Sequence, residues 1–195
     1  MAPEAAMSCE IGPKASQMIK SKYPLAQVYR LLEAGPVVLV TTNRGGRTNI
    51  MTLSWHTMME FMPPLVGCVV SNRNYSFETL KATRECVINI PTAELAATVV
   101  GCGNTSGRRV DKFKVFGLTP VAAKCVQAPL IAECYANLEC KLPDGKLVAK
   151  YNFFILEVVN AWINPARKNP RTIHHQGEGE FMVAEGDESD GTLAL

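Results

Sequence analysis

Two short stretches combine hydroxyl groups, amides and cations in a way that suits a phosphate group. The first, "VVSNRNYSFETL", leads from a strand into a helix and offers Ser71, Asn72, Arg73, Tyr75 and Ser76. The second, "GCGNTSGRRVDKF", is a glycine-rich loop that offers Thr105, Ser106, Arg108, Arg109 and Lys112 beside exposed backbone amides. Free N–H groups at a helix N-terminus, hydroxyls and one or two cations are the donors that phosphate requires. For each stretch alone, the competing interpretation is a simple helix cap or a solvated turn.

Other familiar chemical motifs are missing. Position 106 is Ser where a dinucleotide fingerprint needs its third Gly, and no Lys follows Gly107 as in a Walker loop. His174 and His175 have only the distant His56 as a third imidazole, so we expect no metal site. No Ser–His–Asp or Cys–His pattern is present, and we assign no catalytic side chain; Cys102 would be reactive only if a nearby cation lowered its pKa.

Composition excludes several classes of protein. The chain has 195 residues, of which 47% are hydrophobic and 19% are charged, as in ordinary globular domains. A net charge of +2 is too small to attract nucleic acid or an anionic membrane. No apolar run could span a bilayer or act as a signal peptide. Seven cysteines without a C-x-x-C pair argue against a disulfide framework, so we expect a cytoplasmic protein.

The elements that must position these stretches are mainly short strands joined by hairpin turns. We expect strands at 37–42, 49–55, 65–71, 86–90, 131–142 and 150–163, and helices at 24–34, 74–85, 92–101 and 110–117. This order predicts a mostly β protein, a closed antiparallel barrel with flanking helices, rather than a doubly wound parallel sheet. Residues 1–22 read as an N-terminal arm, and residues 23–195 as a single domain with a polar tail from about 166.

The segments together resemble the flavin reductase-like, FMN-binding split-barrel family, with the flavoredoxin branch nearest. "NIMTLSW", the Pro63–Pro64 break, "LVGCVVSNRNYSFETLK", "CVINIPTAEL", "CGNTSGRRVDKF" and "APLIAECYANLEC" follow in the order and at about the spacing of that family. The resemblance covers about Val37 to Val159. It implies a split antiparallel barrel and a homodimer that binds one FMN per subunit near the interface.

By position, the resemblance also assigns cofactor-binding residues. Those that would meet the isoalloxazine ring are Asn49, Met51, Thr52, Ser54 and Trp55. Those that would lie near the ribityl chain and phosphate are Ser71, Asn72, Tyr75 and Ser76, and those that would close over the flavin are Ser106, Gly107 and Lys112. Phe181 would cover the ring from the tail. A strand that mixes Met and Trp with small Thr and Ser suits a flat ring with one apolar and one polar edge.

The resemblance favours an FMN-dependent oxidoreductase of flavin reductase type, in which a reduced nicotinamide donates electrons to the bound FMN. The acceptor would be a flavin, a small molecule or a protein, and Lys112 is expected to tune the flavin. The alternative is a flavoredoxin-like electron carrier that has no nicotinamide site and takes electrons from a redox protein. A nucleic-acid-binding module based on Arg108, Arg109, Lys112 and Lys114 is a third hypothesis, disfavoured by the net charge.

Overall fold

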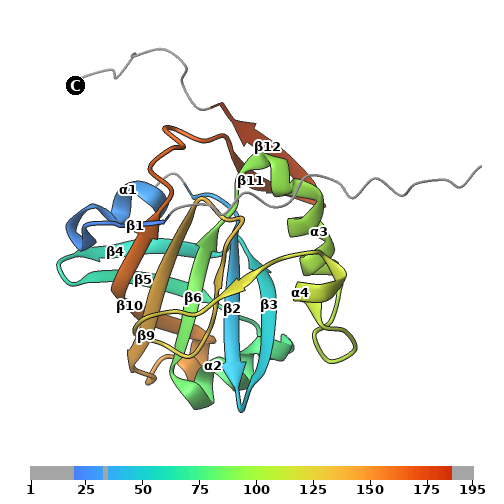
Figure 1. Ribbon diagram of the computed structural model, residues 1–195. Helices are drawn as coiled ribbons and strands as arrows, with labels where there is room; N and C mark the ends of the chain where they lie inside the picture. Colours follow the sequence, from blue (N-terminus) through green and yellow to red (C-terminus); the bar gives the residue numbers. More distant parts are fainter. Residues whose placement is uncertain (1–19, 33–34, 186–195) are drawn as a thin grey trace, which may run out of the picture.

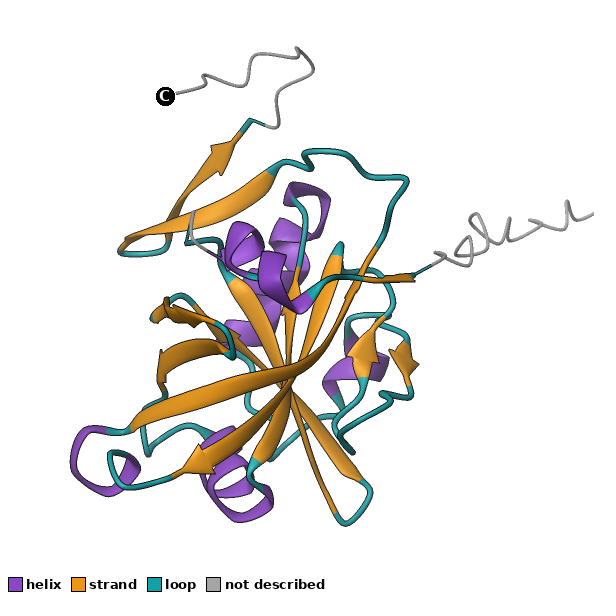
Figure 2. Cartoon of the chain, turned by 90° about the vertical axis from the view of Figure 1, so that its left-hand side faces the viewer, coloured by secondary structure: helices purple, strands orange, loops and turns teal. Residues whose placement is uncertain are grey.

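One antiparallel sheet, curled on itself, forms the body of the molecule (Figure 1). The computed structural model describes residues 20–32 and 35–185. In the main sheet the strands are ordered β3-β2-β6-β9-β10-β5-β4, and β1 adds to β10. Figure 2 shows these strands crossing through the middle of the molecule, with helices around them. The predicted fold class, a mostly β split barrel with flanking helices, is confirmed.

The strands of the main sheet include three hairpins. Their bounds are β1 Ser21–Lys22, β2 Val38–Arg44, β3 Arg47–Leu53, β4 His56–Phe61, β5 Pro64–Val69, β6 Glu85–Ile90, β9 Ala136–Asp144 and β10 Phe153–Ile163. Hydrogen-bonded pairs β2–β3, β4–β5 and β9–β10 are each consecutive in the chain. In the β2–β3 hairpin, Gly45 and Gly46 adopt positive φ (59° and 82°), which glycine allows without steric cost.

The helices are short and lie outside the barrel. They are η1 Leu25–Gln27, α1 Tyr29–Leu32, α2 Tyr75–Thr83, η2 Ala93–Leu95, α3 Ala96–Asn104, α4 Lys112–Val115 and α5 Val148–Tyr151. Asp111 begins α4 as a true N-cap, because its carboxylate accepts hydrogen bonds from the N–H groups of Phe113 and Lys114. Figure 1 shows α3 and α4 beside β3 on one flank of the barrel and α2 at its lower end.

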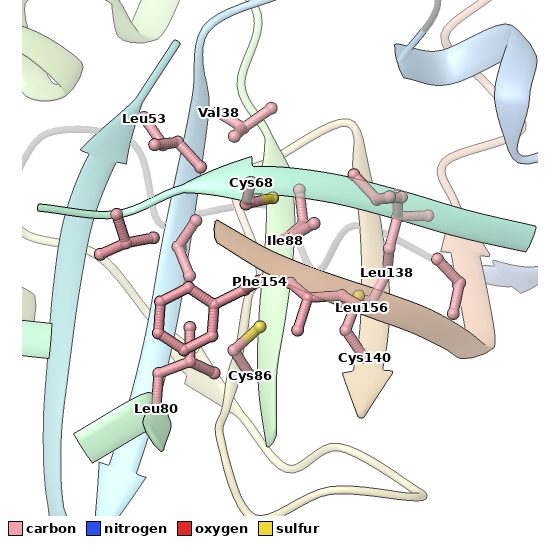
Figure 3. Close-up of a cluster of buried hydrophobic side chains, with 14 of the residues drawn as sticks. Val38, Leu53, Cys68, Leu80, Cys86, Ile88, Leu138, Cys140, Phe154 and Leu156 are labelled. Carbon is pink, nitrogen blue, oxygen red and sulfur yellow. The ribbon is translucent and has the colours of Figure 1, made fainter. Parts of the chain in front are cut away.

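The barrel interior is filled by apolar side chains from strands far apart in sequence. Figure 3 shows Cys68, Cys86, Cys140 and Phe154 pointing toward one another, and all four are at most 1% exposed. The Phe154 ring meets Phe77 of α2 edge-on at 5.4 Å, which attaches the helix to the barrel. A second cluster, including Leu39, Ile50, Val99 and Cys102, joins β2 and β3 to α3.

The C-terminal region differs most from the sequence interpretation. In the region expected as a polar tail from about 166, the chain forms a hairpin, β11 Thr172–Gly177 and β12 Glu180–Ala184. Ile173 anchors it: the side chain is 1% exposed in the second cluster, and its carbonyl accepts a hydrogen bond from the N–H of Val37. Of the expected arm 1–22, residues 1–19 lie outside the described residues, and Ser21–Lys22 pairs with β10.

The expected strand 131–142 is divided, and its polar face is buried. A short hairpin, β7 Pro120–Val121 and β8 Leu130–Ile131, precedes β9. Glu139 is fully buried and accepts hydrogen bonds from Trp162, Asn160 and the N–H groups of Lys124 and Cys125. Burial alone would raise the pKa of this carboxyl, but these donors together lower it. The carboxylate therefore attaches the loop before β8 to the sheet.

Candidate functional site

A cavity of about 260 Å³ lies between β3, the start of α2, the end of α3 and the loop that follows α3. It brings together segments from Asn49 to Lys112, which are 63 positions apart in the chain. The lining residues are Asn49, Met51, Thr52, Arg73, Asn74, Tyr75, Ser76, Cys102, Gly103, Asn104, Thr105, Ser106, Gly107 and Lys112. Among these described residues there is no Asp or Glu, and Arg73 and Lys112 are cations. The cavity therefore offers an anion a positive environment.

The floor of the cavity is a tight contact between Asn49, Ser76 and Gly107. The Asn49 side-chain amide donates to the Ser76 hydroxyl oxygen at 2.8 Å, and both residues are buried. A Cβ on Gly107 would lie 1.9 Å from Asn49 Oδ1, so only glycine fits there without movement. Asn49 Oδ1 is buried without a hydrogen-bond partner among the described residues. An unpaired buried acceptor at the wall of a cavity is costly unless a ligand donates to it.

The N-terminus of α2 supplies hydrogen-bond donors to one end of the cavity. Asn74 precedes the helix in extended conformation, and its side chain forms no capping hydrogen bond. The first N–H groups of a helix have no partner within the helix and lie at its positive end. Ser76 accepts from Asn49 through its oxygen, so its hydroxyl proton remains available for donation. This end is therefore suited to a phosphate group.

Lys112 links two walls of the cavity. Its ammonium donates to the Ile50 carbonyl on β3 at 2.7 Å and to the Cys102 carbonyl on α3 at 2.6 Å. The side chain is buried, and this burial lowers its pKa, partly offset by the Cys102 thiol. An ammonium has three protons, so one remains for a ligand. Lys112 thus holds α3 against β3 and retains a donor.

Cys102 is not an activated nucleophile. It is fully buried, and burial raises the pKa of its thiol to about 11, against the opposing effect of Lys112. The nearby cation that could have made this cysteine reactive is present, but desolvation outweighs it.

Eight of the thirteen sequence-predicted site residues line the cavity. They are Asn49, Met51, Thr52, Tyr75, Ser76, Ser106, Gly107 and Lys112. Thr52 is fixed by a 2.7 Å hydrogen bond from its hydroxyl to the Val99 carbonyl of α3. Sequence reasoning had noted Arg73 and Thr105 in these stretches without assigning them, and had not placed Gly103 or Asn104 at the site. The signal available in the sequence was the run from Cys102 to Gly107, because the last residues of α3 and the loop after it line one wall of the cavity together.

The other five predicted residues lie outside the cavity lining. They are Ser54, Trp55, Ser71, Asn72 and Phe181. Trp55 is 70% exposed between β3 and β4. Ser71 accepts a hydrogen bond from the Arg73 N–H through its side chain, and Asn72 is exposed in the same turn. Phe181 lies on β12, with its ring 5.2 Å from that of His175.

The described residues contain neither a metal-binding cluster nor a membrane-spanning helix. No group of three or more His, Cys, Asp or Glu side chains in residues 20–32 and 35–185 could hold a metal ion. No helix in the part of the chain that the structure describes has the length and apolarity needed to cross a membrane.

Comparison with known proteins gives one consistent family. Residues 30–180 match the model of the flavin reductase like domain. The uncharacterized protein YddH of Escherichia coli is 32% identical over 171 residues, which cover 80% of this chain and 89% of YddH.

Among solved structures, the FMN-binding domain of a flavin reductases-like enzyme from Shewanella baltica superimposes with a TM-score of 0.80. It is 28% identical and covers 90% of this chain and 100% of its own. Flavoredoxin of Desulfovibrio vulgaris, 22% identical with a TM-score of 0.71, covers 96% of this chain and 99% of its own and shows the same fold. The family match, together with the barrel topology, confirms the family that the sequence motifs indicated: this chain belongs to the flavin reductase-like domain family.

Proposed function

We propose that this protein is an FMN-dependent oxidoreductase that passes electrons from a reduced nicotinamide to a flavin, a small molecule or a protein. The observation that carries the proposal is the cavity at β3 and α2, in a chain of the flavin reductase-like family. The relative from Shewanella baltica, which is described as FMN-binding, supports FMN as the cofactor.

The residues that line the cavity fit FMN. Its phosphate is a dianion that needs N–H, hydroxyl and cationic donors, and the start of α2, Ser76 and Arg73 offer all three. The ribityl chain carries hydroxyl groups, and the unpaired Asn49 Oδ1 is an acceptor of the kind that they require. Bound there, FMN would supply the redox chemistry that no side chain of this protein provides.

The protein's own contribution is binding, orientation and charge. Lys112 and Thr52 each bond backbone carbonyls across the cavity, which fixes the distance between β3 and α3. Gly107 allows the loop after α3 to approach Asn49 closely. A cavity held in this way is pre-organised, so less binding free energy is spent on ordering it. We assign no side chain to proton transfer.

We also propose a homodimer, because β4 and its flanks expose apolar side chains at the end of the sheet. Trp55 is 70% exposed, Met62 65%, Phe61 55% and Met59 45%. β4 ends the strand order, so one edge of it is unpaired among the described residues. Exposed apolar groups gathered on an unpaired edge are typical of an interface, and a second copy related by a twofold axis would cover both edges at once. Trp55 follows β3 closely, which would place the partner subunit near the candidate site.

A flavoredoxin-like electron carrier is the alternative function. The fold of this chain is that of a flavoredoxin, and the exposed face beside Trp55 could equally receive a redox protein. We propose the cytoplasm as the location, since the described cysteines are free thiols, as reducing compartments maintain them.

One experiment separates the enzyme from the carrier. The purified protein is loaded with FMN, and the absorbance of NADH or NADPH at 340 nm is followed with and without added acceptor. Turnover that depends on FMN supports the reductase. A yellow protein that binds FMN but oxidises neither nucleotide supports the carrier, and a protein that does not bind FMN contradicts both.

A further inference from the structure

A second cavity adjoins the candidate FMN cavity on the other side of Gly107. Its volume is about 340 Å³, and it is lined by Gly46, Arg47, Thr48, Gly107, Arg108, Arg109, Val110 and Asp111. Gly107 lines both cavities, so their contents would be close neighbours. The first cavity already has its own cations, Arg73 and Lys112. The three arginines of the second cavity are thus additional to what one phosphate of FMN requires.

These three arginines have no carboxylate partner among the described residues. None of them takes part in the ion pairs found in residues 20–32 and 35–185. Asp111 is the one acid in the lining, and its charge is already engaged by the capped N–H groups of α4 and by Lys114 at 3.7 Å. Unopposed guanidinium groups around a hollow favour an anionic ligand, and their planar forks match phosphate oxygens.

Two of the arginines are held in place, and the third is free to bind. Arg47 donates to the carbonyls of Gly107 and Arg108, both at 3.3 Å. The guanidinium groups of Arg47 and Arg108 lie over the Tyr75 ring, at 5.1 and 5.6 Å from its centroid. The exposed Arg109 side chain forms no hydrogen bond or ion pair within the described part of the chain. Its full set of donors is therefore available to a ligand.

We propose that this second cavity binds the adenosine phosphate of a dinucleotide. A hollow of this volume, bordered by glycine backbone and the Thr48 hydroxyl, suits a nucleotide better than the flat surface of an acidic protein. The phosphate contacts Arg108 and Arg109, with the rest of the dinucleotide extending toward the flavin. Two dinucleotides share this chemistry: the nicotinamide reductant, whose use rests on the proposed function, and FAD held in place of FMN.

The test is calorimetric titration of the full-length protein, loaded with FMN, with 2′,5′-ADP, 5′-AMP and adenosine. We expect the two phosphorylated ligands to bind at least tenfold more tightly than adenosine, and more weakly as salt increases. Arg109→Gln should weaken the phosphorylated ligands on the order of tenfold, since a charge-assisted hydrogen bond is lost. The matched control is Lys168→Gln, which removes an exposed cation from the segment between β10 and β11 and should have no effect.

The two sources of the adenosine phosphate give different results. If the reductant supplies it, the nucleotides bind to FMN-loaded protein, and Arg109→Gln weakens them there. If FAD supplies it, apoprotein binds FAD more tightly than FMN, and Arg109→Gln removes the difference. Equal binding of adenosine and its phosphates together with no preference for FAD overturns the proposal, as does an equal effect of Arg109→Gln and Lys168→Gln. Because these are binding measurements, they are independent of whether the protein oxidises NADH or NADPH.

Discussion

Gly107→Ala should damage both the stability of the protein and its affinity for FMN. The added Cβ would lie 1.9 Å from Asn49 Oδ1 and 2.5 Å from Asn49 Cγ. Real contacts are about 3.4 Å or more, so either the loop or Asn49 must move by more than about 1 Å. Asn49 cannot turn away freely, because its amide donates to Ser76 at 2.8 Å in a buried position.

The expected loss of stability follows from the two ways of relieving this clash, a shift of the loop or a shift of Asn49. Overpacking a buried contact costs about 1–3 kcal/mol, and losing the Asn49–Ser76 hydrogen bond costs about 0.5–1.5 kcal/mol. We therefore expect the free energy of unfolding to fall by about 2 kcal/mol. If the FMN-bound form bears a further cost of about 2 kcal/mol in restoring the cavity, FMN affinity falls about 30-fold, at 1.4 kcal/mol for each factor of ten.

The measurements are urea denaturation of the apoprotein and quenching of FMN fluorescence on binding. Gly103→Ala is the stability control: it lies in the same wall, and its Cβ would meet nothing closer than the Thr52 side chain at 3.4 Å. A double-mutant cycle with Asn49→Ala tests the cause, since Gly107→Ala should cost at least about 1 kcal/mol less once Asn49 is truncated. If Gly107→Ala is as stable as the wild type and binds FMN equally well, the close contact does not constrain the site.

Three further predictions concern other parts of the molecule. Lys112→Met should leave two carbonyls unpaired and so lower the free energy of unfolding by about 2–4 kcal/mol. Loss of the ammonium near the flavin ring should also lower the two-electron potential of bound FMN by about 20–45 mV. An unshifted midpoint in spectroelectrochemistry would exclude contact between Lys112 and the ring. Burial lowers the pKa of His56, and the hydrogen bond to the Pro36 carbonyl offsets only part of this shift. The unfolded state therefore binds a proton more readily than the folded state below pH 6.5. Stability should therefore fall as the pH falls from 6.5, and His56→Gln should flatten that slope in denaturation at several pH values; equal slopes would refute it. Met62→Glu, at the exposed end of β4, should convert a dimer to a monomer in light scattering, and a monomeric wild type would contradict the proposed interface.

The barrel follows from local patterns in the sequence, whereas the residues assigned to the cavity came mainly from the family resemblance. β-branched runs separated by hairpin turns predicted β2, β3, β5, β6 and β10, and the strand-to-helix turn predicted the start of α2. The assigned residues that line the cavity belong to three short segments whose positions follow once those elements are known. Gly107 was assigned by resemblance, and the close approach to Asn49 is its physical reason.

The parts that sequence did not predict depend on contacts between distant segments. Strand periodicity places Glu139 on the face of its strand opposite the apolar residues, but donors from the preceding loop and from β10 bury it. The polar tail forms a hairpin because Ile173 docks against the second apolar cluster, a contact that local periodicity does not reveal. Ser54 and Trp55 were expected at the ring, yet the chain turns away after Leu53 into β4, a strand that the sequence analysis did not expect. The arginines of the second cavity, which form no ion pair among the described residues, come from the start of β3 and from the loop after α3.

The most direct test of the central claim is a crystal structure of the protein with FMN. We predict the FMN phosphate at the N-terminus of α2, within hydrogen-bond distance of Ser76 or the adjacent N–H groups, with the flavin in the cavity beside β3. A phosphate bound only by Arg108 and Arg109, or a flavin that lies elsewhere on the barrel, would contradict this account of the site.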